Sequence, residues 1–205
     1  MMAAHFCGLN GKEVHLLDHN TQVGRKILIS GGGKCNFTNL YGSDPKDYYS
    51  ENPHFVKSAL SRYSPWEFIN LIIENDIPYD ERLHGQLFCK RSAKDINTIL
   101  LTQLNKKNIH IKLGQKNLEV ETISTGYRVY NETVEYIAKD LVIATGGLVL
   151  PQIGASSFGH VIAKRFGHKI IPTTPALVPF KITGVSELAG NAFIVGISCN
   201  EHYVA

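Results

Sequence analysis

The glycine-rich stretch at residues 24–39 constrains the possible folds of this chain more than any other part of the sequence. Its three consecutive glycines, Gly31 to Gly33, let the backbone approach a flat or anionic ligand with no side chain in between. A flexible basic loop is the ordinary alternative, but the Asn and Thr side chains that follow the glycines favour a held conformation. We therefore predict a ligand-facing loop around the short apolar patch at residues 27–29. Positive charge in this stretch comes from Arg25, Lys26 and Lys34.

A short apolar segment at residues 13–18 predicts a buried strand that ends in a carboxylate, Asp18. In dinucleotide-binding folds an acidic residue at this position accepts hydrogen bonds from the adenosine ribose hydroxyls. Many strand-ending acids are only solvated, so Asp18 alone is weak evidence. A glycine-rich phosphate turn should precede such an acid by about 20 residues. Because that count runs past Met1, we expect the chain to begin inside the first βαβ unit, without its first strand. The amides of the missing turn would neutralise a pyrophosphate, so we also expect the chain alone to bind a dinucleotide poorly.

A second apolar segment, residues 140–147, predicts a buried strand over residues 141–144 that runs into Thr145, Gly146 and Gly147. Glycines directly after a buried strand let the backbone pass close to a cofactor that a side chain would block. The alternative is an ordinary glycine turn between a strand and a loop. Together with the glycine-rich stretch, this segment favours a dinucleotide-binding domain.

The remaining segments mix helical and strand patterns, which predicts an α/β domain with a parallel sheet and an antiparallel insertion. A Pro-rich and Thr-rich segment at residues 172–179 predicts a domain crossing, so we expect one domain over residues 1–173 and the start of a β-rich inserted domain over residues 174–205. Helical patterns cover residues 1–9, 53–62, 65–75, 92–108 and 158–166. Strand patterns cover residues 85–90, 109–113, 118–124, 127–131 and 134–137.

Composition limits the classes of partner and the cellular location that we expect for this chain. Twenty-one Lys and Arg against 18 Asp and Glu give a net charge of +3, which is no argument for a nucleic-acid or membrane partner. Four scattered cysteines predict free thiols in a reducing compartment, and no apolar run is long enough for a membrane span, so we expect a cytoplasmic protein. Cys35 beside Lys34 is a candidate reactive thiol, and a cysteine that only packs is the favoured alternative. His15 is expected to lie in the core.

The stretch at residues 24–39 closely resembles the BaiN/YhiN-like (aminoacetone oxidase-like) family of NAD(P)/FAD-dependent oxidoreductases, with Lys34 where Arg is usual. Residues 140–147 resemble the second FAD fingerprint of such flavoproteins. Departures occur at Gln86, Cys89 and Phe158, where Arg, Pro and Asp are usual. The resemblance implies a doubly wound Rossmann-like FAD-binding domain and a chain like a member truncated at both ends. It implies cofactor contacts from Asp18, Arg25, Lys26, Ser30, Gly31, Gly32, Gly33, Cys35, Asn36, Val120, Thr145, Gly146 and Gly147.

The function implied by the resemblance is flavin-dependent hydride transfer on a small molecule, with NAD(P)H as electron donor. No catalytic acid or base is identified, and no metal site is expected. Two alternatives stay open: an inactive fragment of such an enzyme, and a tRNA-modifying flavoprotein. The absence of a Lys and Arg cluster in the sequence speaks against the second alternative, so the expected partners are FAD and a small substrate, without nucleic acid.

Overall fold

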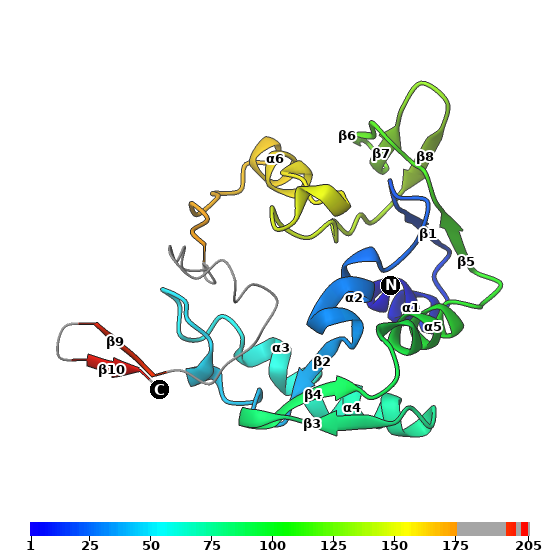
Figure 1. Cartoon of the computed structure of the whole chain (residues 1–205). Coiled ribbons are helices and arrows are strands. Elements are labelled where there is room, and N and C mark those ends of the chain that lie inside the picture. The colour runs from blue at the N-terminus through cyan, green and yellow to red at the C-terminus, as the bar shows by residue number, and fades with distance from the viewer. Residues whose placement is uncertain (176–195, 200–201, 205) are drawn as a thin grey trace. The chain divides into compact units, whose positions relative to one another are not determined.

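A computed structural model describes residues 1–175, 196–199 and 202–204 (Figure 1). Met1 to His168 form one compact unit, and a second unit begins at Lys169. In the second unit the described strands β9 (Ile197–Cys199) and β10 (His202–Val204) pair antiparallel. Most of the predicted inserted domain lies outside the described residues, so the boundary at residue 173 stays a prediction.

One parallel strand pair holds the amino-terminal part of the first unit together. Strand β1 (Val14–Leu17) pairs parallel with β5 (Ile109–Lys112). Both strands were predicted, but their pairing was not. Helix α1 (Met2–Leu9) packs on both strands, and Ala4, Leu104 and Ile109 form their shared core. The pair places Asp18 directly after β1, where the Asp18 amide donates to the carbonyl of Lys112 (3.0 Å).

His15 does not lie in the core, so that prediction is wrong. Its side chain is exposed and stacks on His110 of the neighbouring strand, with ring centroids 5.1 Å apart. The physical reason is alternation along the strand: when Val14 and Leu16 contact the core under α1, the residue between them must point to the other face.

The first antiparallel sheet has the strand order β2-β4-β3 and bounds the largest core. It consists of β2 (Asn36–Asn39), β3 (Tyr79–Glu81) and β4 (Gln86–Cys89). Helices α4 (Pro65–Glu74) and α5 (Ala93–Gln103) contact β2 and β4, respectively. Ser92 caps α5 by accepting the amide of Lys94 (3.2 Å), as a capping residue should. Two helices are shorter than predicted: α3 spans Lys57–Arg62, and α5 ends at Gln103.

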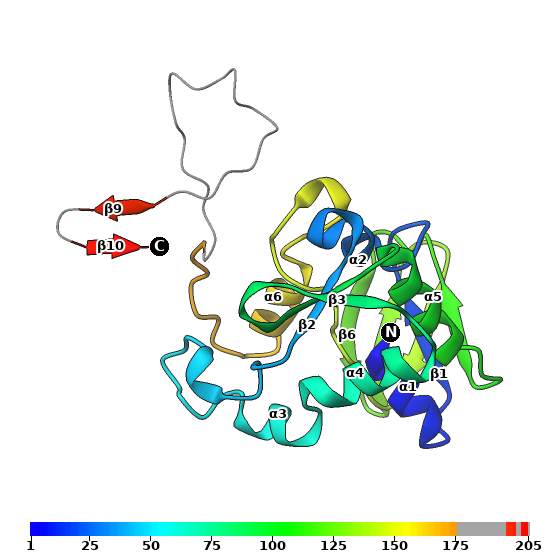
Figure 2. The same cartoon turned by 60° about the horizontal axis from the view of Figure 1, so that its bottom comes forward.

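The glycine-rich stretch is not a continuous loop. Residues Arg25–Ile29 form a short helix, α2, which lies between β1 and β2 in the chain (Figure 2). A tight turn, η1 (Ser30–Gly33), then leads to Cys35 and β2. The helix is anchored on α5 by the buried Asn97, whose amide donates to the carbonyl of Val23 (3.1 Å). The prediction missed the helix because only one turn of apolar residues carries it.

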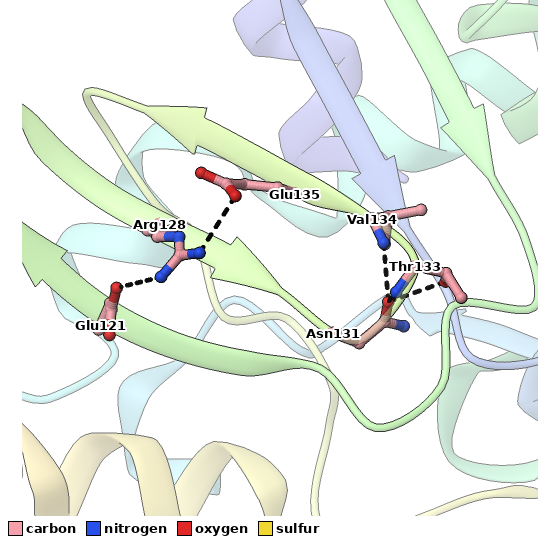
Figure 3. Close-up of polar contacts among 6 residues, drawn as sticks. All are labelled: Glu121, Arg128, Asn131, Thr133, Val134 and Glu135. Atoms are coloured by element: carbon pink, nitrogen blue, oxygen red, sulfur yellow. Dashed lines mark hydrogen bonds and ion pairs between the residues drawn. The ribbon is translucent and has the colours of Figure 1, made fainter.

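The second antiparallel sheet has the strand order β6-β7-β8, with β6 (Glu119–Ile123), β7 (Gly126–Tyr130) and β8 (Glu135–Ala138). One face carries Val120 and Val129, which pack on Ile162 of helix α6 (Phe158–Arg165). On the other face Arg128 bridges Glu121 (2.9 Å) and Glu135 (3.1 Å) (Figure 3). The β7–β8 turn is closed by Asn131, whose side-chain oxygen accepts from the amides of Thr133 and Val134 (Figure 3).

The predicted buried strand at residues 141–144 is absent. Val142 and Ile143 are 61% and 37% exposed, and residues 141–149 make no backbone hydrogen bond with the rest of the described chain. A strand forms only when a neighbouring strand satisfies its amides and carbonyls, and no described strand does so here. Short 3-10 turns complete the unit at Pro45–Asp47 (η2), Leu83–Gly85 (η3) and Pro151–Ile153 (η4).

Candidate functional site

The carboxylate of Asp18 is held in a fixed orientation at the end of β1. Its Oδ1 accepts the backbone amide of Asn20 (2.9 Å) and the side-chain amide of the same residue (3.2 Å). Arg25 Nη1 in turn donates to the Asn20 side-chain oxygen (2.9 Å), which ties the first residue of α2 to this turn. Oδ2 of Asp18 has no hydrogen bond to any residue that the structure describes. With its side chain 28% exposed, Asp18 can accept a bond from a ligand hydroxyl.

The glycine turn is a held conformation rather than a flexible loop. Gly31, Gly32 and Gly33 have φ values of 56°, 65° and 82°, a left-handed region that side chains disfavour. The turn is closed by the amide of Cys35, which donates to the carbonyl of Ser30 (3.0 Å). A Cβ at Gly31 would lie 2.7 Å from Phe88 and 2.8 Å from the Asn36 amide nitrogen, whereas one at Gly32 would meet only open space. Successive exposed backbone segments of this kind suit an anionic or flat ligand.

A pocket of about 300 Å³ lies beside this turn and collects four of the predicted cofactor residues. Its polar side consists of Lys26, Ser30, Cys35 and Asn36. The opposite wall is apolar and was not predicted from the sequence, because its residues come from four separate elements. Those lining residues are Ile27, Phe37, Phe68, Ile96 and Leu100. A cationic and amide rim over an apolar wall fits a flavin ring better than it fits a metal ion or a nucleophilic reaction.

Cys35 is a packed residue, as the favoured interpretation held. It is 6% exposed, and burial raises the pKa of its thiol, with a smaller opposing effect from the hydrogen bond to Ser30. A reactive thiolate at Cys35 is therefore disfavoured. The neighbouring Lys34 does not activate it, because the Lys34 ammonium donates to the carbonyl of Lys90 (2.7 Å). Burial raises the pKa of Cys89, in the same core, to about 11.

Nine of the thirteen predicted contact residues do not line the pocket. Five of them belong to the Asp18 turn and the glycine turn described above, and the other four are Val120, Thr145, Gly146 and Gly147. Val120 is buried under α6, where its carbonyl accepts from Arg165 (3.1 Å). Thr145 lies against Gly159 of α6, and Gly146 and Gly147 have open space around them. Gly154, which directly follows η4, lies against the side chain of His19. The segment after η4 thus reaches the turn that follows Asp18, a contact that nothing in the sequence indicated.

Sequence reasoning also missed Asn20 and Phe88. Asn20 joins Asp18 to Arg25, and its place two residues after a strand-ending acid in a loop is a usable signal for such a turn. Phe88 supports the glycine turn from β4, but an aromatic residue in a buried strand carries no signal for that role.

A parallel strand that ends in an oriented carboxylate, followed by a held glycine turn beside a partly apolar pocket, defines a dinucleotide-binding α/β domain. Residues 1–192 match the HI0933-like protein Rossmann domain, and the chain belongs to this family. The family is one of FAD-binding Rossmann proteins, so the predicted fold class is confirmed and the cofactor class is FAD or a similar dinucleotide.

Three relatives give the family match more detail. Ribosomal RNA dihydrouridine synthase of Escherichia coli is 44% identical over 89% of this chain and 45% of its own length. The protein of the same name from Haemophilus influenzae is 46% identical over 83% of the chain and 43% of its length. The 3-dehydro-bile acid delta(4,6)-reductase of Clostridium scindens is 24% identical over 83% of the chain and 41% of its length. The chain therefore spans less than half the length of the relatives it matches. Among the described helices, none is both long and apolar enough to cross a membrane.

Proposed function

We propose that this chain is the FAD-binding part of an oxidoreductase that acts on ribosomal RNA. The observation that carries the proposal is the pocket beside the glycine turn, which gathers Lys26, Ser30, Cys35 and Asn36 from the stretch that resembles a flavin-facing segment. The choice of RNA rests on the two relatives of 44% and 46% identity, both named as ribosomal RNA dihydrouridine synthases. A cytoplasmic location stays a prediction of the sequence.

Different residues of the chain would contact different parts of the bound FAD. Asp18 accepts a ribose hydroxyl at its Oδ2, since Oδ1 is already occupied by Asn20. Gly31 to Gly33 let the backbone approach the isoalloxazine edge, and Lys26 and Asn36 offer a positive charge and an amide on the pocket rim. The bound flavin would supply hydride transfer, with NAD(P)H as the proposed reductant. The apolar wall around Phe37 and Phe68 would pack against one face of the flavin ring.

An RNA substrate replaces the expectation of a small-molecule substrate without nucleic acid. That expectation rested on the overall charge of +3, which says nothing about how charge is distributed. Residues 19–43 carry Arg25, Lys26 and Lys34 and no Asp or Glu, so the segment that supplies the polar side of the pocket is locally basic. Reduction of a small unsaturated substrate is the second candidate, and the bile acid reductase relative of 24% identity favours it.

The cofactor proposal is tested by titrating the purified chain with FAD and following the quenching of flavin fluorescence. We expect weak but saturable binding at one site. Asp18→Ala should weaken binding about tenfold through loss of the ribose contact, the size of a typical charged hydrogen bond. Asp44→Ala is the matched control, because Asp44 caps only the η2 turn by accepting the Lys46 amide. Absence of saturable binding would refute the proposal and favour the inactive alternative.

The substrate proposal is tested by expressing the chain in bacteria that lack their own ribosomal RNA dihydrouridine synthase. Nucleosides from digested ribosomal RNA are then analysed by mass spectrometry for the mass gain of two hydrogen atoms on uridine. We expect the gain with the wild-type chain and its loss with Asp18→Ala. If flavin binds but no reduced uridine forms, while an unsaturated steroid ketone oxidises the NADH-reduced flavin, the second candidate is correct instead.

A further inference from the structure

The hairpin turn between β3 and β4 exposes an unusual set of side chains. Leu83 at its tip is 80% exposed, and Tyr41, which follows β2, is 65% exposed. The two positions belong to one patch because the Tyr41 ring lies against Gly85, where a Cβ would come within 2.7 Å of the ring. Exposed aromatic and aliphatic side chains that gather beside a basic residue need a physical explanation, because burial elsewhere would stabilise the chain.

The patch is held in place by its backbone. The Arg82 amide donates to the carbonyl of Gln86 (2.8 Å), and the Leu40 amide donates to the carbonyl of Gly85 (2.9 Å). The side-chain amide of Asn39 donates to the carbonyl of His84 (2.8 Å). His84 has a φ of 60°, a left-handed conformation that costs energy for a residue with a side chain. Exposure of Leu83 and Tyr41 is therefore a fixed feature of a braced turn, which suits a contact surface.

A cation completes the patch. The Arg82 guanidinium carbon lies 3.9 Å from the centroid of the Phe88 ring. Among the described residues, no carboxylate oxygen lies within 4.0 Å of a guanidinium nitrogen of Arg82. Two acids flank it along β3. Asp80 shares its sheet face but pairs with Lys90 (3.8 Å), and Glu81 alternates to the opposite face. The guanidinium is thus flat, fixed and available to an anion.

The patch adjoins the flavin-facing turn through a single side chain. Phe88 carries Arg82 on its ring, and the same ring lies against Gly31 of the glycine turn. A ligand that contacts Arg82 and Tyr41 therefore reaches the edge of the proposed flavin site. This position is where a polymeric substrate would need support beyond the reacting base.

We propose that Tyr41, Arg82, Leu83 and His84 form a contact surface for a single-stranded segment of RNA. Tyr41 offers a ring face on which a base can stack, and Arg82 offers its planar fork to a phosphate. The inference rests on the proposed function, since it assigns the surface that holds the RNA beside the flavin. A protein partner is disfavoured because an unpaired guanidinium next to an exposed aromatic ring matches a phosphate and a base together.

The test is fluorescence anisotropy of a labelled single-stranded RNA oligonucleotide titrated with the full chain at several salt concentrations. We expect Tyr41→Ala to weaken binding about tenfold, the effect of losing one stacked base. Arg82→Gln should weaken it about fivefold at low salt and lower the log–log salt slope by about 0.7, the value for one phosphate contact on a single strand. Arg82→Lys keeps the charge and should restore the slope.

Matched controls separate the patch from general effects. Tyr49→Ala removes a fully exposed tyrosine outside the patch, and Arg128→Gln removes an arginine from the other antiparallel sheet. Neither should alter RNA binding. Equal affinity of wild type and both patch variants would overturn the inference, as would a concentration-dependent dimer that Leu83→Ser abolishes without any loss of RNA binding. Because RNA binding is measured without product formation, binding through the patch in a chain that yields no reduced uridine would refute the proposed function alone.

Discussion

The two three-stranded antiparallel sheets of the first unit have the same strand number and opposite surroundings. In β2-β4-β3 the central strand is buried on both faces: Leu87 and Cys89 face one side, and Phe88 faces the glycine turn and Arg82 on the other. In β6-β7-β8 only the face under α6 is buried, and the other face carries the Arg128 ion pairs (Figure 3). The turn proposed to face the flavin therefore packs against the sheet whose central strand is buried on both faces.

Gly31→Ala should disrupt the packing of the glycine turn on β4 more than any of the other substitutions below. The added methyl group would force a left-handed alanine and would also collide with the Asn36 amide and the Phe88 ring. We expect a loss of about 4 kcal/mol in the free energy of unfolding and loss of FAD binding. Urea denaturation and the FAD titration measure the two effects.

Gly32→Ala is the control that isolates the collision. Gly32 has the same left-handed backbone, but its Cβ would meet nothing within 4 Å. We expect a loss of only about 1 kcal/mol from backbone strain. Equal losses for the two variants would mean that strain alone matters and that the contact between Gly31 and β4 does not fix the turn.

Large-to-small substitutions in the two sheets sharpen the comparison. Leu87 and Val120 are 1% and 2% exposed and occupy β4 and β6. Leu87→Ala should lower the free energy of unfolding by about 3 kcal/mol and Val120→Ala by about 2 kcal/mol, because each leaves a cavity. Only Leu87→Ala should weaken FAD binding, since β4 supports the glycine turn. An equal effect of Val120→Ala on FAD affinity would instead revive the predicted adenine contact at Val120.

The same contrast explains how much of the fold could be predicted. Strands of the β6-β7-β8 sheet were placed within a residue or two, since one solvated face gives the sequence a period of two. The continuous apolar run at residues 141–144 was misread as a strand, because apolar runs predict burial only when a partner strand is available. Whether a partner exists is decided by topology, which a local pattern does not encode.

Of the candidate pocket, the sequence predicted the polar side and missed the apolar wall. Lys26, Ser30, Cys35 and Asn36 were found because they lie within one contiguous motif, and they do line one pocket. The apolar wall was missed, since Phe68 and Leu100 reach it from distant helices with no spacing that marks them. Contacts between segments far apart in the chain need the fold first, so contiguous motifs predict one side of a pocket and leave the opposite side open.

Alkaline pH should destabilise the chain through the β2-β4-β3 sheet and not through β6-β7-β8. Burial raises the pKa of Cys89 to about 11 from an ordinary value of 9.0, and raises that of Cys35 as well. A raised folded-state pKa means that stability is fully present below pH 9 and is lost as pH rises toward 11. We expect a decline of about 2 kcal/mol in the free energy of unfolding over this interval. Cys89→Ala should flatten the decline, and Cys7→Ala, which lies outside this core, should leave it intact.

Removing the Arg128 ion pairs of the β6-β7-β8 sheet should have the smallest effect on stability. Hydrogen bonds to Glu135 and then Glu121 raise the pKa of Arg128 above its ordinary value, but all three side chains lie at the surface, where water and salt screen their attraction. Arg128→Gln should therefore lower the urea midpoint less than any substitution above, and high salt should erase the difference. FAD affinity should not change. A salt-resistant loss comparable to that of Val120→Ala would show that the ion pairs, rather than packing under α6, hold β6-β7-β8 together.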